Sequence, residues 1–200
     1  MNNREILSSG CRSCGSGCCG GEVPKQAGKR KVVIDFLYLD LSVCKWCQGT
    51  DKSLEEALND ISNVLQASGI EVVVNKINVT SQELAIKHKF ISSPTIRVNG
   101  RDIQMEVREK LCDSCGDLCG DNVDCRVWVY NGEEYTIPPK ALIIEGILKA
   151  VYGGETAYDS TEYKLPENLK KFYKSMNQKN KINGNNKKSL FCGSGENKCC

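Results

Sequence analysis

The chain has 200 residues, of which 40% are hydrophobic and 26% are charged, and its formal net charge is +2. This balance is typical of a folded globular protein, and the length suits one domain of ordinary size with tails. This composition excludes a largely disordered chain. No apolar stretch is long enough for a signal peptide or a membrane-spanning helix, so we expect a cytoplasmic protein.

Cysteine is the unusual component, with 13 residues in four groups. Permanent disulfide frameworks are rare in a reducing cytoplasm, so this number of thiols points to metal binding or redox chemistry. Basic residues exceed acidic ones in both tails, but the tails have little aromatic interleaving. The sequence therefore does not favour nucleic-acid binding.

The first elements are a tail, a strand and a helix. Residues 1–30 are rich in Gly and Cys and cannot build a core, so they predict a flexible tail. The apolar run at 32–39 predicts a strand, and apolar residues at helical spacing over 54–65 predict an amphipathic helix. Thr50 or Asp51 could cap the start of this helix.

The rest of the chain alternates further strands and helices. Asn-Gly pairs between alternating apolar runs predict two tight hairpins. A proline opens the helix that follows the second hairpin. In order, the predicted elements are a strand at 70–77, a short helix at 81–89, hairpins at 91–105 and 126–137, a helix at 139–151 and a short helix at 165–176.

The order β-α-β-α-β-β-α, with Cys44-Lys45-Trp46-Cys47 after the first strand and Ser93-Pro94-Thr95 before the third, resembles the thioredoxin/glutaredoxin fold. Within that superfamily the chain resembles an uncharacterised prokaryotic thioredoxin-like family with a Cys-rich insertion. The resemblance implies an α/β domain at 31–153 with an insertion at 108–137. Residues 154–200 would add a short helix and a flexible Lys/Asn-rich tail.

The resemblance also implies a redox dithiol. Cys44 would be the attacking thiol, because the N-terminus of the following helix lowers its pKa, and Cys47 would resolve the mixed disulfide. Pro94 would be a cis-proline that faces the dithiol. Gly49 could delay the start of the helix and so weaken the effect of its N-terminus on the pKa of Cys44. The alternative to a redox dithiol is that Cys44 and Cys47 are two incidental buried cysteines.

The insertion contains a C-x2-C-x3-C-x5-C pattern. Four thiolates can close a tetrahedral zinc site, whereas an iron–sulfur cluster is less favoured because the spacing matches no common cluster signature. Thiols that respond to redox state or to metalloids are the alternative. The candidate metal ligands are Cys112, Cys115, Cys119 and Cys125.

Each tail contains Cys-Gly-Ser-Gly followed by two adjacent cysteines, directly in the N-terminal tail and after three further residues in the C-terminal tail. Adjacent cysteines form a disulfide reluctantly, so these pairs favour a soft ion such as trivalent arsenic or antimony, Hg(II) or Cu(I). The design is similar to that of small thioredoxin-like arsenic metallochaperones, although tail cysteines without a role are also possible. The candidate metalloid ligands are Cys11, Cys14, Cys18, Cys19, Cys192, Cys199 and Cys200.

The leading hypothesis is a thioredoxin-like dithiol protein that binds a thiophilic metal or metalloid ion, with trivalent arsenicals as the preferred cargo, for detoxification or hand-over to efflux. The alternatives are a general thiol–disulfide oxidoreductase and a zinc-stabilised binding module without turnover. Expected partners are the soft ion and a thiol–disulfide partner or efflux protein. No nucleic acid and no membrane insertion is expected.

Overall fold

The computed structural model describes residues 30–153 and 162–189, with the backbone alone over 182–189. Apart from Arg30, the predicted N-terminal tail lies outside the described residues, as do all seven candidate metalloid ligands of the two tails. Among the described residues, no helix combines the length and the apolar character needed to cross a membrane.

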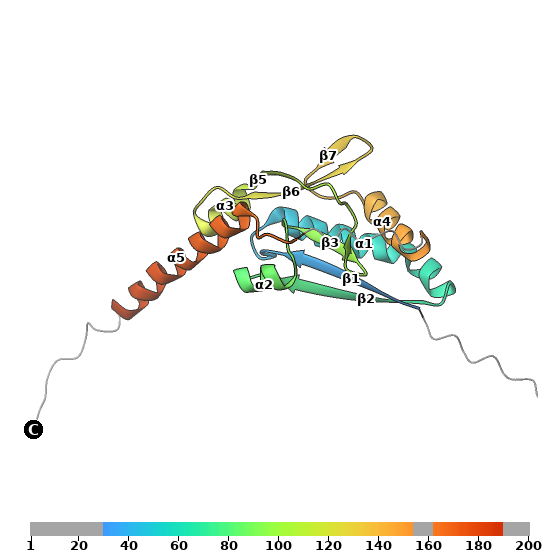
Figure 1. The fold of residues 1–200 in the computed structure, drawn as a ribbon, viewed down its shortest axis with the longest axis horizontal. Helices are drawn as coiled ribbons and strands as arrows, with labels where there is room; N and C mark the ends of the chain where they lie inside the picture. The colour runs from blue at the N-terminus through green and yellow to red at the C-terminus, as the bar shows by residue number, and fades with distance from the viewer. Residues whose placement is uncertain (1–29, 154–161, 190–200) are drawn as a thin grey trace, which may run out of the picture.

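A mixed four-stranded sheet forms the centre of the molecule, which confirms the predicted α/β class (Figure 1). The central strand β1 pairs in parallel with β2 and antiparallel with β3. Its alternating apolar side chains, among them Ile34 and Phe36, are buried. The sheet order is β2-β1-β3-β4, formed by β1 (Arg30–Tyr38), β2 (Ile70–Asn78), β3 (Thr95–Val98) and β4 (Arg101–Asp102).

Three helices accompany this sheet in the chain order predicted from the sequence. Helices α1 and α4 contact each other and share one apolar cluster with the sheet (Figure 1). Ser81 caps α2 by accepting a hydrogen bond from the backbone N–H of Leu84. The helices are α1 (Lys45–Ala67), α2 (Gln82–Lys87) and α4 (Lys140–Tyr152).

Helix α1 begins earlier than the sequence suggests. Its N-cap is Cys44, so the prediction that Thr50 or Asp51 caps the helix is wrong. Gly49 lies inside the helix and does not delay it. A Cβ at Gly49 would collide with the side chain of Ile137, so close packing explains this glycine better than helix breaking does.

The insertion forms a second sheet with the order β5-β6-β7. The two predicted hairpins are confirmed: Asn99-Gly100 and Asn131-Gly132 all have positive φ, as tight Asn-Gly turns require. A short strand and a short helix in the insertion were not predicted. The elements of the insertion are β5 (Arg108–Leu111), α3 (Asp113–Cys119), β6 (Asp124–Tyr130) and β7 (Glu133–Tyr135).

The last described element is α5 (Glu167–Ser189), which is 23 residues long and extends well beyond the predicted helix at 165–176. It contacts α3 and α2 (Figure 1). Leu169, Phe172 and Tyr173 are buried, and the Tyr173 hydroxyl donates a hydrogen bond to the backbone oxygen of Val79 at 2.9 Å. The first part of the helix therefore belongs to the core, whereas residues 177–181 are exposed.

Candidate metal centre

Four cysteine sulfurs from three elements meet inside the molecule. Cys44 is the N-cap of α1, Cys112 is the N-cap of α3, Cys115 lies in α3, and Cys125 lies in β6. Their Sγ atoms all lie within 4.8 Å of one another, and all four residues are buried. The Sγ atoms of Cys115 and Cys125 are 3.3 Å apart.

The spacing of the sulfurs suits a tetrahedral metal. Zinc–sulfur bonds of about 2.3 Å place the corners of a tetrahedral site about 3.8 Å apart. This edge length falls between the 3.3 Å of the Cys115–Cys125 pair and the 4.8 Å limit of the whole group. All six described cysteines are free thiols. The four-cysteine group could therefore hold a metal such as zinc.

The thiols of this centre influence one another strongly. Hydrogen bonds from the Cys112 thiol, and then from Cys115 and Cys125, hold the pKa of Cys44 well below its usual range. Hydrogen bonds with the Cys112 sulfur raise the pKa of Cys115 and of Cys125, and burial of these two thiols raises their pKa values further. Contacts with Cys115, and then with Cys125, also lower the pKa of Cys112. The protonated Cys115 and Cys125 thus favour thiolates at Cys44 and Cys112, and a bound cation would allow Cys115 and Cys125 to ionise as well.

Cys47 lies at the edge of the centre, where its thiol contacts both the Cys44 sulfur and Ser93. Its backbone N–H donates a hydrogen bond to the Cys44 sulfur at 3.4 Å, whereas its own Sγ lies 3.4 Å from the hydroxyl oxygen of Ser93. The Ser93–Pro94 peptide bond is cis, as the resemblance implied. The hydrogen bond with the Cys44 sulfur, and then burial, raises the pKa of Cys47. The C-x-x-C is therefore divided between the cysteines of the insertion and the cis-proline loop.

Cys119 also stands apart from the four sulfurs. Its thiol donates to the backbone oxygens of Asp121 at 3.6 Å and Gly116 at 3.9 Å, and burial raises its pKa. The structure thus brings three of the four predicted insertion ligands together with Cys44 and leaves Cys119 out. Local spacing along the chain could not reveal this, because Cys44 joins the group only through the tertiary fold.

Arg126, a buried residue next to Cys125, links the insertion to the main sheet through a hydrogen bond and an ion pair. The backbone N–H of Arg126 donates to the Ser93 oxygen at 2.7 Å, and its guanidinium forms a 2.7 Å ion pair with Asp102. The same guanidinium lies 4.7 Å from the ring centroid of Trp128. Sequence reasoning missed Arg126, although a lone arginine inside an apolar strand is a signal of a buried ion pair.

An apolar shell encloses the sulfurs on the remaining sides. It joins residues of β1, α2 and α5 in one cluster with the cysteines. Such a shell limits access by water and lowers the local dielectric constant, which strengthens metal–thiolate bonding. Its members include Leu37, Leu39, Val79, Phe90, Leu169, Phe172 and Tyr173.

Comparison with known proteins identifies relatives without a described activity. Residues 32–147 match the model of a domain of unknown function, DUF2703. That span contains all six described cysteines but not α5. An uncharacterised protein of Archaeoglobus fulgidus is 30% identical over 99 residues, covering 48% of this chain and 70% of the relative. No solved structure matches the chain.

Proposed function

This chain belongs to the DUF2703 family, and we propose that it is a thioredoxin-like protein that binds a thiophilic metal ion through Cys44, Cys112, Cys115 and Cys125. The observation that carries the proposal is the meeting of four buried sulfurs within 4.8 Å of one another. Zinc fits best, because it prefers four thiolates in a closed tetrahedral site.

Three features support the thioredoxin-like interpretation. The elements of the main sheet follow the chain order that the resemblance implies, and they form a mixed sheet in which β1 is parallel to β2 and antiparallel to β3. A C-x-x-C opens the helix that follows β1. A cis Ser93–Pro94 bond lies beside Cys47. The insertion places three further cysteine ligands beside Cys44, the position that a thioredoxin would use for thiol–disulfide exchange.

The proposed role is to hold the ion and hand it over to a thiol-bearing or efflux partner in the cytoplasm. The ion would replace the protons of the thiols and neutralise the thiolates in a region from which water is largely excluded. Metal–thiolate contacts can also be exchanged one at a time, which suits transfer between proteins. A purely structural zinc module would use the same ligands but would release the ion far more slowly.

Trivalent arsenic is the second candidate. It is a soft ion that needs only three thiolates, and the compact group offers more than one set of three sulfurs. Titration of the zinc-loaded protein with arsenite distinguishes the two ions. Stoichiometric release of zinc would favour the arsenical, and retention of zinc in excess arsenite would remove it.

A general oxidoreductase has weaker support. Cys44 and Cys47 have no exposed surface, and the Cys44 sulfur is surrounded by the thiols of the insertion. A nucleophile that must meet a protein disulfide needs access as well as a low pKa. We therefore rank exchange chemistry below metal binding for this dithiol.

Site-directed variants with metal analysis test the proposed centre. Cys44→Ser and Cys125→Ser should each lose most bound zinc and the visible bands of tetrathiolate cobalt, because each removes one of four ligands. Cys119→Ser and Cys47→Ser remove equally buried thiols that lie outside the group and should retain the metal. Full zinc binding in Cys44→Ser would refute the proposed ligand set.

A further inference from the structure

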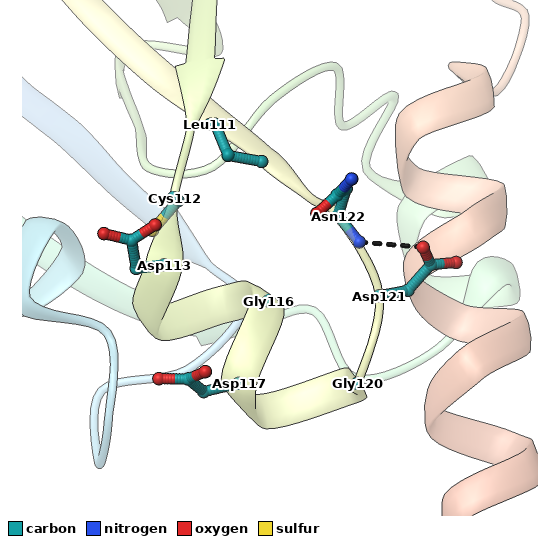
Figure 2. Close-up of a pocket in the computed structure, with 8 residues that line it drawn as sticks. All are labelled: Leu111, Cys112, Asp113, Gly116, Asp117, Gly120, Asp121 and Asn122. Carbon is teal, nitrogen blue, oxygen red and sulfur yellow. Dashed lines mark hydrogen bonds between the residues drawn. The ribbon is translucent and has the colours of Figure 1, made fainter.

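A hollow of about 490 Å³ opens beside α3, next to the proposed centre (Figure 2). Residues between Leu111 and Asn122 line it, and Cys112 is one of them, whereas the other three cysteines of the centre are not. A water molecule occupies about 30 Å³ in the liquid, so the hollow has room for small reactants. A small molecule that enters it therefore meets Cys112 before the other three thiols.

Cys112 also belongs to a second C-x-x-C. It directly precedes α3, and Cys115 lies in the first turn of that helix. The two sulfurs lie within 4.8 Å of each other, and both residues are free thiols. Contact with Cys115 makes the largest contribution to the lowered pKa of Cys112. Because both cysteines lie in one short segment, a disulfide between them requires no movement of one element past another.

The C-x-x-C of α1 is less accessible from the hollow. Cys44 and Cys47 have no exposed surface, and neither residue lines the hollow. The Cys47 thiol contacts the Ser93 hydroxyl and lies outside the group of four sulfurs. A reactant in the hollow therefore meets the dithiol of the insertion before the dithiol of α1.

Access through the hollow limits the size of the reactant. Cys112 is only 1% exposed, so its sulfur cannot meet a disulfide on the surface of another protein. A small oxidant does not have this restriction. In the metal-loaded centre the four cysteines are thiolates, and the thiolate is the form of cysteine that oxidants attack most readily.

The hollow also disfavours anions. Among the described residues, three aspartates and no basic residue line it. Asp113 and Asp117 are exposed, and the Asp121 carboxylate accepts a hydrogen bond from the Asn122 backbone N–H (Figure 2). The Lys179 ammonium, at the edge, donates to backbone oxygens of α3. Negative charge repels anionic reactants and has little effect on a neutral one, and hydrogen peroxide is both small and neutral.

We propose that Cys112 and Cys115 form an oxidation site that hydrogen peroxide reaches through the hollow, and that their disulfide releases the metal ion. The inference rests on the proposed function. The Cys112 thiolate attacks one peroxide oxygen and becomes a sulfenic acid, while the other oxygen leaves as hydroxide and takes up a proton to form water. The Cys115 thiolate then attacks the sulfenic sulfur, and the second oxygen leaves as water after it takes up a proton. The two thiolates supply the two electrons that reduce the peroxide.

The disulfide removes two of the four ligands. Only the thiolates of Cys44 and Cys125 remain, and two thiolates close half of a tetrahedral zinc site. Zinc should therefore leave with one ion released for each peroxide consumed at this site, and its own oxidation state does not change. Reduction of the disulfide by excess thiol should restore the four ligands.

Peroxide treatment of the zinc-loaded, full-length protein tests the site. An indicator dye follows zinc release, and differential alkylation with mass spectrometry locates the oxidised cysteines. Cleavage before Asp113, Asp117 and Asp124 places the four insertion cysteines on separate peptides. Cys112 and Cys115 should lose their reactivity towards the alkylating agent at the rate of zinc release, and their two peptides should be joined by a disulfide.

Two variants control for the neighbouring thiols. Cys47→Ser and Cys119→Ser should release zinc at the rate of the unmodified protein, because both cysteines lie outside the four-sulfur group. Release that is tenfold slower in Cys47→Ser would overturn the proposal in favour of the dithiol of α1. A disulfide between Cys115 and Cys125, or zinc retained in excess peroxide, would also overturn it while leaving the centre intact. Absence of zinc from the unmodified protein would instead refute the proposed function.

A change of charge tests the route. Asp113→Asn with Asp117→Asn removes two negative charges from the lining of the hollow. At low salt, the rate with the anion peroxymonosulfate should rise about fourfold relative to the rate with hydrogen peroxide, as expected for two charges about 10 Å away in water. The gain should shrink at physiological salt, because the charges are exposed and screened. An unchanged ratio of the two rates at low salt would overturn entry through the hollow.

Discussion

At the scale of single residues, Cys44 has two sets of sulfur neighbours. Cys47 follows it in the first turn of α1 and donates a backbone N–H to its sulfur, while the insertion thiols approach from the other side. The N-terminus of α1 favours a thiolate at this position, and a thiolate serves metal binding and disulfide exchange alike. The insertion thiols are what favour metal binding here.

The protonation of these thiols makes metal binding dependent on pH. Cys115 and Cys125 have raised pKa values and keep their protons at neutral pH, so an incoming ion must displace both. Zinc affinity should therefore fall by about a hundredfold for each pH unit of acidification, one factor of ten per proton released. Competition with a calibrated chelator at several pH values measures this slope, and an affinity that is independent of pH would contradict the protonated state of the two thiols.

At the scale of elements, local patterns predicted most of the main sheet and its helices. The alternation in β1 and the Asn-Gly turns act over a few residues, so they are visible in the sequence. Helix α3 and strand β5 are short and carry charged residues, and their stability depends on packing against β6 and α5. The composition after residue 176 suggested a tail, yet α5 continues to Ser189.

The candidate site was predicted in part for the same reason. The insertion cysteines are close in the chain, so their spacing suggested a common ion, and the C-x-x-C suggested a dithiol. The contact between Cys44 and the insertion requires β6 to cross the cis-proline loop, where the backbone N–H of Arg126 donates to Ser93. That contact is a property of the tertiary fold, and no spacing in the sequence encodes it.

Arg126 should therefore act as a positioning residue for Cys125. Arg126→Lys retains the positive charge but removes the planar guanidinium, which donates hydrogen bonds to Asp102, Thr95 and the Gln104 backbone oxygen at the same time. We expect weaker zinc binding and a shift of the cobalt spectrum from four towards three sulfur ligands as Cys125 moves away. Loss of stability alone would leave that spectrum unchanged.

Arg108→Lys provides a matched control for this change. Arg108 pairs with Glu106 and Glu134 on the surface, and its side chain is 47% exposed, compared with 1% for Arg126. Exposed pairs contribute little, about 0–1 kcal/mol, whereas disruption of a buried pair costs about 3–5 kcal/mol. A cobalt spectrum of Arg126→Lys identical to that of Arg108→Lys would contradict the positioning role.

At the scale of the whole molecule, the proposed centre joins α1, α3 and β6. Helix α5, which follows the residues matched by the family, packs on the same apolar cluster. Leu169, Phe172 and Tyr173 place apolar surface on the same cluster that contains the cysteines. The insertion and α5 thus depend on each other. The main sheet has its own apolar cluster, formed with α1 and α4.

Removal of the metal should therefore affect the two halves of the molecule unequally. Binding free energy is folding free energy for the segments that the ion joins, so a chelator should lower the melting temperature and accelerate amide exchange over residues 108–125 and in α5. In β1, the backbone amides of residues whose side chains belong to the cluster with α1 and α4 should keep most of their protection, because that cluster contains none of the four sulfurs. Hydrogen-exchange mass spectrometry before and after chelation measures both regions. Cys44→Ser should exchange like the chelated protein even with zinc present, whereas uniform acceleration in all elements would show that the centre stabilises the fold as one cooperative unit.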